Sequence, residues 1–329
     1  MTRHIVWQAA LVLLGIALTF VILFQLASSE PPPPVETSEV PATGGTYVEG
    51  VLGYSAIINP ILAPSMLQGN PVDQDINALV FDGLTSLQPS GEITPSLAVD
   101  WEVSEDGTEY EFRLREDVRW HDGAPFTASD VAFTVQAIQD PGFQGDPALQ
   151  ALWRTVIVDQ PDDHTIKFTL QEPFPSFPLY TTMGLLPAHL LSRVAAMELP
   201  GHDFSTKHPI GTGQFMVKSI SSDRVVLEAN PDYRGPRPYL QGIEFWFSTD
   251  WDGLLADYEQ GVIHGFHPPG PENLPVVTQL PKLQVYAAPS AGYGLVYLNQ
   301  KRESVPFFQE LEVRQALLYA LDRQLLLDK

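Results

Sequence analysis

The sequence predicts a mixed fold, between α+β and α/β, in which strands and helices are interleaved without strict βαβ order. Two observations predict it. Apolar and polar residues alternate in several short segments, as in half-buried strands, and other segments carry apolar residues at helical spacing. Glycine and proline pairs separate these segments, as expected of turns. The sequence shows no internal repeat, so it does not predict a solenoid.

The clearest strand lies in GTEYEFRLR, residues 107–115. Tyr110, Phe112 and Leu114 share one side and charged residues the other, which predicts a strand with one buried face. Residues 154–170 and 211–230 each predict a β-hairpin. Single strands are expected at the start of GTYVEGVLGYSAIINPIL, in IEFWF and in AGYGLVYLNQ.

The segment HDGAPFTASD joins the first of these strands to a helix. His121 and Asp122 are residue types found in metal sites and acid–base pairs, but a glycine follows them, and Asp–Gly is a strong turn dipeptide. Thr127 and Asp130 have the spacing of a capping box, which predicts that a helix begins here. We therefore interpret His121 and Asp122 as turn residues.

Further helices are expected where apolar residues recur at helical spacing. They are QDINALVFDG, the segment from Thr127 to Asp140, WDGLLADYEQG and EVRQALLYALDRQLLLD. The stretch PFPSFPLYTTMGLLPAHLL is rich in proline, with a short helix expected near its end.

Composition limits the classes of function. Hydrophobic residues make up 44% of the 329 residues, as in a globular protein of about two domains. The net charge of −22 makes nucleic acid and anionic membrane surfaces poor partners. Cysteine is absent, which excludes disulfides, thiolate ligands and cysteine nucleophiles and fits an exported protein.

The first residues predict a membrane anchor. A basic N-terminus precedes an apolar run of about 20 residues, and acidic residues follow it. We expect a cytoplasmic segment at 1–4, a signal anchor or transmembrane helix at 5–27 and a proline-rich linker at 28–45. Cleavage near Ala27, which would release a secreted or periplasmic protein, is the alternative.

Signatures of catalysis and of cofactors are scarce. The GTG at 211–213 lacks the third glycine of a nucleotide-binding loop. His264 and His267 have a spacing compatible with a metal site, but prolines follow them and no helix would hold both rings. Ser55 and Ser104 lack the context of a nucleophile elbow. We predict no enzyme activity, no cofactor and no metal site.

Several stretches, in the same order, resemble family 5 of the extracellular solute-binding proteins, the peptide-, nickel- and glycan-binding receptors of ABC importers. They are SLAVDWEVSEDGTEYEFRLREDVRWHDGAPFTASDVAFTV, then HPIGTGQFMVKSI with VVLEANPDYRGPRPYLQGIEF, and LNQKRESVPFFQELEVRQALLYALDR. The resemblance spans nearly everything from Gly45 to Lys329 and implies a two-lobed fold, periplasmic-binding-protein type II. Gln214 and His264 depart from the family pattern, which usually has proline and aspartate there.

The resemblance also implies a division into domains. Residues 46–75 and 207–287 would form lobe I, 76–206 an extra subdomain of it, and 288–329 the start of an incomplete, truncated lobe II. One strand and one helix cannot bury their own apolar faces. We therefore expect three leucines of the last segment to be exposed or packed in a non-native way. They are Leu317, Leu318 and Leu325.

By the same resemblance, ligand contacts fall in the loop after INP and on the strand that crosses to lobe II. We expect Tyr54, Ser65, Met66, Tyr293 and Tyr297 to be ligand-binding residues. The alternative, that these are ordinary loop and core residues, stays open for each of them.

The implied function is that of an extracytoplasmic receptor that binds oligopeptides or similar small solutes and hands them to the permease subunits of an ABC transporter. We expect a monomer, anchored to the outer face of the cell membrane by its N-terminal helix, with no nucleic-acid partner. A non-transporting sensor module or a degenerate fragment is the alternative, and a secreted hydrolase is less consistent with the missing catalytic groups. With one wall of the cleft absent, the chain is expected to show no melting shift with millimolar peptides.

Overall fold

The computed structural model describes residues 42–55, 57–62, 71–267, 270, 273–286, 298–301 and 304–322. They belong to two compact units, Met1–Pro269 and Gly270–Lys329. Both large sheets lie in the first unit.

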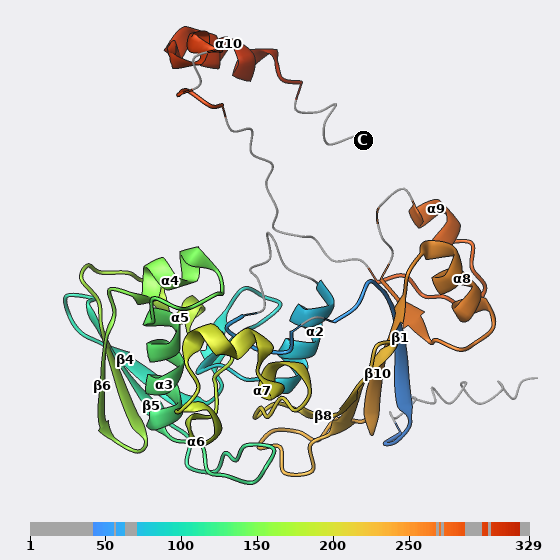
Figure 1. Ribbon diagram of the computed structural model, residues 1–329, viewed down its shortest axis with the longest axis horizontal. Coiled ribbons are helices and arrows are strands. Elements are labelled where there is room, and N and C mark those ends of the chain that lie inside the picture. The colour runs from blue at the N-terminus through green and yellow to red at the C-terminus, as the bar shows by residue number, and fades with distance from the viewer. Residues whose placement is uncertain are drawn as a thin grey trace, which may run out of the picture. The chain divides into compact units, whose positions relative to one another are not determined.

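A five-stranded sheet with the order β11-β1-β10-β9-β8 forms one part of the first unit (Figure 1). Its strands are β1 (Thr46–Leu52), β8 (Phe215–Ile220), β9 (Arg224–Ala229), β10 (Gly242–Ser248) and β11 (Gly265–Phe266). Strand β1 lies between β11 and β10 and runs parallel to both. β8, β9 and β10 pair antiparallel, and the predicted hairpin of 211–230 is confirmed. The sheet therefore joins the start of the described chain to a segment far along it.

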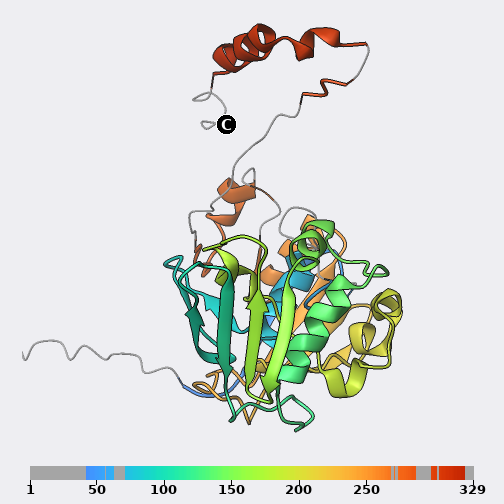
Figure 2. The ribbon, with the colours of Figure 1, turned by 90° about the vertical axis from the view of Figure 1, so that its left-hand side faces the viewer.

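A four-stranded antiparallel sheet with the order β4-β5-β7-β6 forms the other part. Its strands are β4 (Ala98–Val103), β5 (Glu109–Leu114), β6 (Ile157–Asp162) and β7 (Thr165–Thr169). The predicted alternation in β5 is confirmed, because Tyr110, Phe112 and Leu114 are buried and the charged residues between them are exposed. Helix α3 (Ala128–Gln139) covers the inner face, and Figure 2 shows the outer face uncovered.

The segment HDGAPFTASD forms the predicted turn and helix start. Trp120 and Ala124 close the turn with a hydrogen bond of 2.8 Å, and Gly123 has a φ of +87°, which favours glycine. The Asp130 carboxylate accepts the backbone N–H of Thr127 at 2.9 Å, as a capping box requires. It also accepts the backbone N–H of Ala188, so the cap ties α3 to a distant loop.

Short elements complete the first unit. They are α2 (Pro71–Val80), β2 (Thr85–Leu87), β3 (Ile93–Pro95), α4 (Pro147–Trp153), α5 (Phe177–Tyr180), α6 (Ala188–Leu191), η1 (Ala196–Gly201), α7 (Asp203–Thr206) and α8 (Trp251–Glu259). The proline-rich stretch thus holds two short helices, α5 and α6, where one was expected. On α8 only Leu254 is fully buried.

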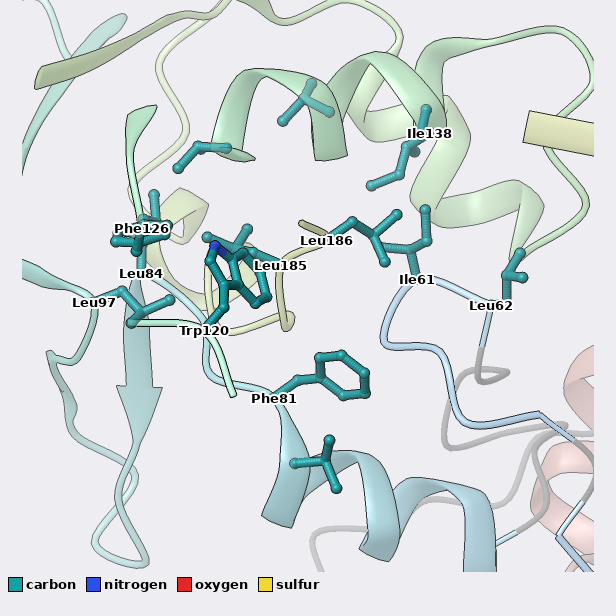
Figure 3. Close-up of a cluster of buried hydrophobic side chains, with 14 of the residues drawn as sticks. Ile61, Leu62, Phe81, Leu84, Leu97, Trp120, Phe126, Ile138, Leu185 and Leu186 are labelled. Carbon is teal, nitrogen blue, oxygen red and sulfur yellow. The ribbon is translucent and has the colours of Figure 1, made fainter. Parts of the chain in front are cut away.

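One hydrophobic core runs through both sheets of the first unit. It includes Val225 and Phe245 from the five-stranded sheet as well as Phe112 and Phe168 from the four-stranded one. Figure 3 shows the part of this core around Trp120, where side chains from loops and helices distant in sequence converge. Because the core is continuous, the two sheets are expected to unfold together.

The second unit holds α9 (Leu274–Val277), η3 (Pro306–Gln309) and α10 (Leu311–Ala320). No residue of α10 is buried, and Leu317 and Leu318 are 47% and 54% exposed, as the sequence predicted. Leu325 and the predicted strand AGYGLVYLNQ, apart from its last residues, lie outside the described residues, as do residues 5–27. Within the described ranges, no helix has the length and apolar character needed to cross a bilayer.

Candidate ligand-binding edge

The candidate site lies where the parallel strands of the five-stranded sheet end. In open α/β sheets, ligands bind outside the carboxyl ends of parallel strands. β1, β10 and β11 are parallel, so their carboxyl ends meet at one edge of the sheet. Gly53 follows β1, Thr249 follows β10 and His267 follows β11. We call this edge the carboxyl edge.

Tyr54 lies on the carboxyl edge, on a loop that is fixed at both ends. Its side chain is 67% exposed. Before it, the N–H of Gly53 donates to the carbonyl of Ser248 at 3.0 Å. After it, the Ser55 hydroxyl donates to the Asp73 carboxylate on α2 at 2.6 Å. The loop therefore presents an aromatic ring to solvent from a position set by β10 and α2.

The other four residues predicted to contact a ligand are not placed by the structure. Ser65, Met66, Tyr293 and Tyr297 lie outside the described residues. Their role, like that of Tyr54, stays a prediction.

A cluster of ionisable groups connects β1 with α2 and with the end of β11. The Tyr47 hydroxyl hydrogen-bonds to the Glu49 carboxylate on β1, and burial together with the charge of Glu49 raises the pKa of Tyr47 to about 12. Burial raises the pKa of Glu49, and the negative charge of Asp75 on α2 adds to the rise. Burial also raises the pKa of Asp75, while His267 opposes the shift in both carboxyl groups.

These two carboxylates are suited to a cationic group. Each is partly desolvated, and a positive charge nearby favours the charged form of each. A protonated amine placed between them would gain from both. Among the described residues, no group of three His, Asp or Glu side chains has the geometry of a metal site.

Sequence reasoning missed Glu49 and Asp75 and considered His267 only as half of a metal pair. His264 has a different role, because it bonds to Val48 twice. Its ring Nδ1 accepts the backbone N–H of Val48 at 3.0 Å, and its backbone N–H donates to the Val48 carbonyl. The alternation of Tyr47, Glu49 and Val51 along β1 could have placed the first two on one face. Nothing local in the sequence indicates that Asp75 lies near them.

A hollow of about 690 Å³ lies elsewhere, beside the four-stranded sheet. Leu87, Trp101, Val103 and Leu179 line it, and most of its lining is apolar. This hollow lies beside the four-stranded sheet and not at the carboxyl edge, so it is not part of the candidate site.

Comparison with known proteins decides the family. The model of the bacterial extracellular solute-binding proteins, family 5 Middle, matches residues 92–329. The chain belongs to family 5 of the bacterial extracellular solute-binding proteins. Its fold is the mixed α/β fold of the type II periplasmic binding proteins, as the sequence predicted.

Similar proteins carry peptide-binding names. The oligopeptide-binding protein AppA of Bacillus subtilis is 28% identical over 295 residues, which cover 86% of this chain and 51% of AppA. A putative ABC transporter peptide-binding protein of Brucella ovis is 32% identical, over 70% of this chain and 43% of its own length. The chain therefore spans about half the length of these curated relatives.

Solved structures agree on the fold. The NikZ structure from Campylobacter jejuni, in complex with Ni(L-His), has a TM-score of 0.70 and 28% identity, and the match covers 85% of this chain and 54% of NikZ. The AppA structure from Bacillus subtilis, in complex with a nonapeptide, has a TM-score of 0.65 and 25% identity, and the match covers 73% of this chain and 47% of AppA.

Proposed function

We propose that this chain is part of an extracytoplasmic receptor of an ABC importer and that oligopeptides, or solutes like them, are its ligands. The observation that carries the proposal is the similarity to proteins named as peptide-binding. The first unit supports it, because it offers an exposed aromatic ring at the carboxyl edge and two partly buried carboxylates on β1 and α2. A receptor needs no catalytic group, and the family consists of binding proteins.

The binding mechanism we propose is closure of two lobes over the peptide. Residues 46–75 and 207–287 would form lobe I, with 76–206 as its extra subdomain and 288–329 as the start of lobe II. Burying the ligand between two walls typically covers 70–90% of a small ligand's surface. The hinge between the lobes would take up the backbone change.

At the carboxyl edge, Tyr54 would pack against an apolar part of the peptide. Glu49 and Asp75 would attract an ammonium group, from the amino terminus or from a lysine side chain, since two acidic groups with raised pKa values are stabilised by a neighbouring cation. We also propose that residues 5–27 anchor the receptor to the outer face of the membrane, where permease subunits would receive the solute.

A hybrid protein tests the proposal. This chain, followed by the part of AppA that lies beyond the matched region, would supply both walls of the cleft. We expect its melting temperature to rise by several degrees with saturating nonapeptide, because ligand-linked stabilisation grows with the ratio of ligand concentration to Kd. The 329-residue chain by itself is expected to show no shift.

Variants of the hybrid locate the site. Tyr54→Ala is expected to weaken peptide binding about tenfold, which corresponds to about 1.4 kcal/mol. Tyr239→Ala is the matched control, since Tyr239 is also exposed but precedes β10, at the strand end opposite the carboxyl edge. A folded hybrid that binds no peptide would reject the ligand class. Micromolar binding by the chain itself would reject lobe closure.

A further inference from the structure

His121 holds two distant parts of the first unit together through its imidazole ring. The turn that contains it follows β5 of the four-stranded sheet, whereas the GTG segment, Gly211–Gly213, leads into β8 of the five-stranded sheet. Three hydrogen bonds join them. The backbone N–H of His121 donates to the Gly211 carbonyl at 2.9 Å. The ring makes the other two bonds: the Gly211 N–H donates to Nδ1 at 3.1 Å, and Nε2 lies 3.1 Å from the Gly213 carbonyl.

These partners fix the protonation state of the ring. A backbone N–H can only donate, so Nδ1 must carry a lone pair to accept from Gly211. A carbonyl can only accept, so Nε2 must carry the hydrogen to donate to Gly213. Only the neutral tautomer with the proton on Nε2 makes both bonds. Protonation of Nδ1 would place two N–H groups against each other.

The opposite side of the GTG segment is equally closed. The Gly213 N–H donates to the Val80 carbonyl at the end of α2, at 2.9 Å. A Cβ at position 211 would lie 1.9 Å from the Val80 oxygen, and one at position 213 would lie 2.4 Å from the Leu79 oxygen. The segment therefore lies between the His121 ring and the end of α2.

The charged groups that face the ring are already paired with others. Asp82 and Asp122 favour protonation of His121, but Asp82 forms an ion pair with Arg234 at 2.6 Å and Asp122 contacts His189 at 2.8 Å. Burial is the strongest influence on the ring and lowers the pKa of His121, in spite of the two carboxylates and the Gly213 carbonyl. The electrostatics thus favour the same neutral ring that the hydrogen bonds require.

We propose that His121 is a proton-sensitive clamp that joins the two sheets of the first unit at neutral pH and releases the GTG segment in acid. The unfolded chain takes up a proton on this residue near pH 6.5, above the pH at which the folded chain does. Stability is therefore fully present above about pH 6.5 and falls as the pH decreases below it. The expected loss is up to tenfold in the folding equilibrium constant per pH unit from this residue alone.

Urea unfolding of the full chain between pH 5 and pH 8 tests the clamp. His121→Asn offers a side-chain oxygen to the Gly211 N–H but does not titrate. The stability of this variant should therefore fall less steeply below pH 6.5 than that of the wild type. The difference in slope should be up to tenfold in the folding equilibrium constant per pH unit. His208→Gln, at an exposed histidine, is the control and should keep the wild-type slope. Equal slopes in wild type and His121→Asn would overturn the proposal.

A second measurement applies even if the Asn variant fails to fold. Nitrogen chemical shifts of the wild-type histidines report which ring nitrogen carries the proton. We expect His121 to show the neutral form protonated on Nε2 at pH 7 and to keep it below pH 6.5. A signal that titrates at or above pH 6.5, or that shows the proton on Nδ1, would overturn the proposal.

Discussion

Helices α3 and α10 have similar sequence patterns and opposite environments. Both are amphipathic, and both were predicted from apolar residues at helical spacing. In α3 seven of the 12 residues are buried, against β6, β7, α4 and α6. In α10, which has 10 residues, none is buried. Amphipathic spacing thus predicts that a helix forms, whereas a packed neighbour decides whether its apolar face contributes to stability.

The ends of the two helices differ in the same way. At the start of α3, the Asp130 carboxylate accepts hydrogen bonds from the N–H of Thr127 and of Ala188 and from the Trp120 indole. At the start of α10, the Glu310 side chain makes no capping hydrogen bond. Contacts with distant parts of the chain therefore hold α3 both along its buried face and at its N-terminus.

The largest expected difference between the two helices is in how much the free energy of unfolding falls when an apolar side chain is removed. Ile138→Ala in α3 should lower the free energy of unfolding by about 2–5 kcal/mol, since it leaves a cavity in a closed core. Leu317→Ala in α10 should change it by less than about 0.5 kcal/mol. Urea unfolding of the full chain measures both.

Ile157→Ala is the matched control, because Ile157 is the same residue type and is exposed on the edge strand β6. It should behave like Leu317→Ala. If Leu317→Ala lowered the free energy of unfolding as much as Ile138→Ala, α10 would have a packed neighbour in solution.

The next difference concerns the helix starts. Asp130→Asn should lower the free energy of unfolding by about 1–3 kcal/mol. The amide cannot accept hydrogen bonds from all three donors, so at least one donor is left buried without a partner. Glu310→Gln should cost less than about 0.5 kcal/mol. Equal costs in thermal or urea unfolding would show that the Asp130 hydrogen bonds contribute little.

The smallest effect is expected on the open face of the four-stranded sheet, opposite α3. Lys167 and Glu111 form an ion pair there with an N–O distance of 2.7 Å, and both side chains are well exposed. Lys167→Gln should lower the melting temperature slightly at low salt and leave it unchanged at high salt, because exposed pairs are screened. A large effect that persists in high salt would contradict this.

Local patterns predicted most of the first unit. The alternation in β5, the two hairpins and the capping box of α3 each depend on residues close in sequence, and the structure confirms them. The proline-dominated region was predicted less well, since α5 is a single turn with no periodic pattern.

The candidate site was harder to predict because it depends on distant residues. Tyr54 lies on the loop after β1, which is held by hydrogen bonds to Ser248 at the end of β10 and to Asp73 on α2. Glu49 meets Asp75 and His267 only after three elements assemble. His121 illustrates the same limit. Its turn was evident from the Asp–Gly pair, but its bonds to Gly211 and Gly213 join residues some 90 positions apart.

Native-state hydrogen exchange tests most directly whether packing, rather than sequence pattern, separates the two helices. The backbone amides of Val135 and Ile138 in α3 should open only with the whole first unit and exchange at least about a thousandfold more slowly than unstructured amides. Those of Leu317 and Leu318 in α10 should exchange close to the unstructured rate. Protection in α10 equal to that in α3 would contradict the distinction and show that a covered face stabilises both helices.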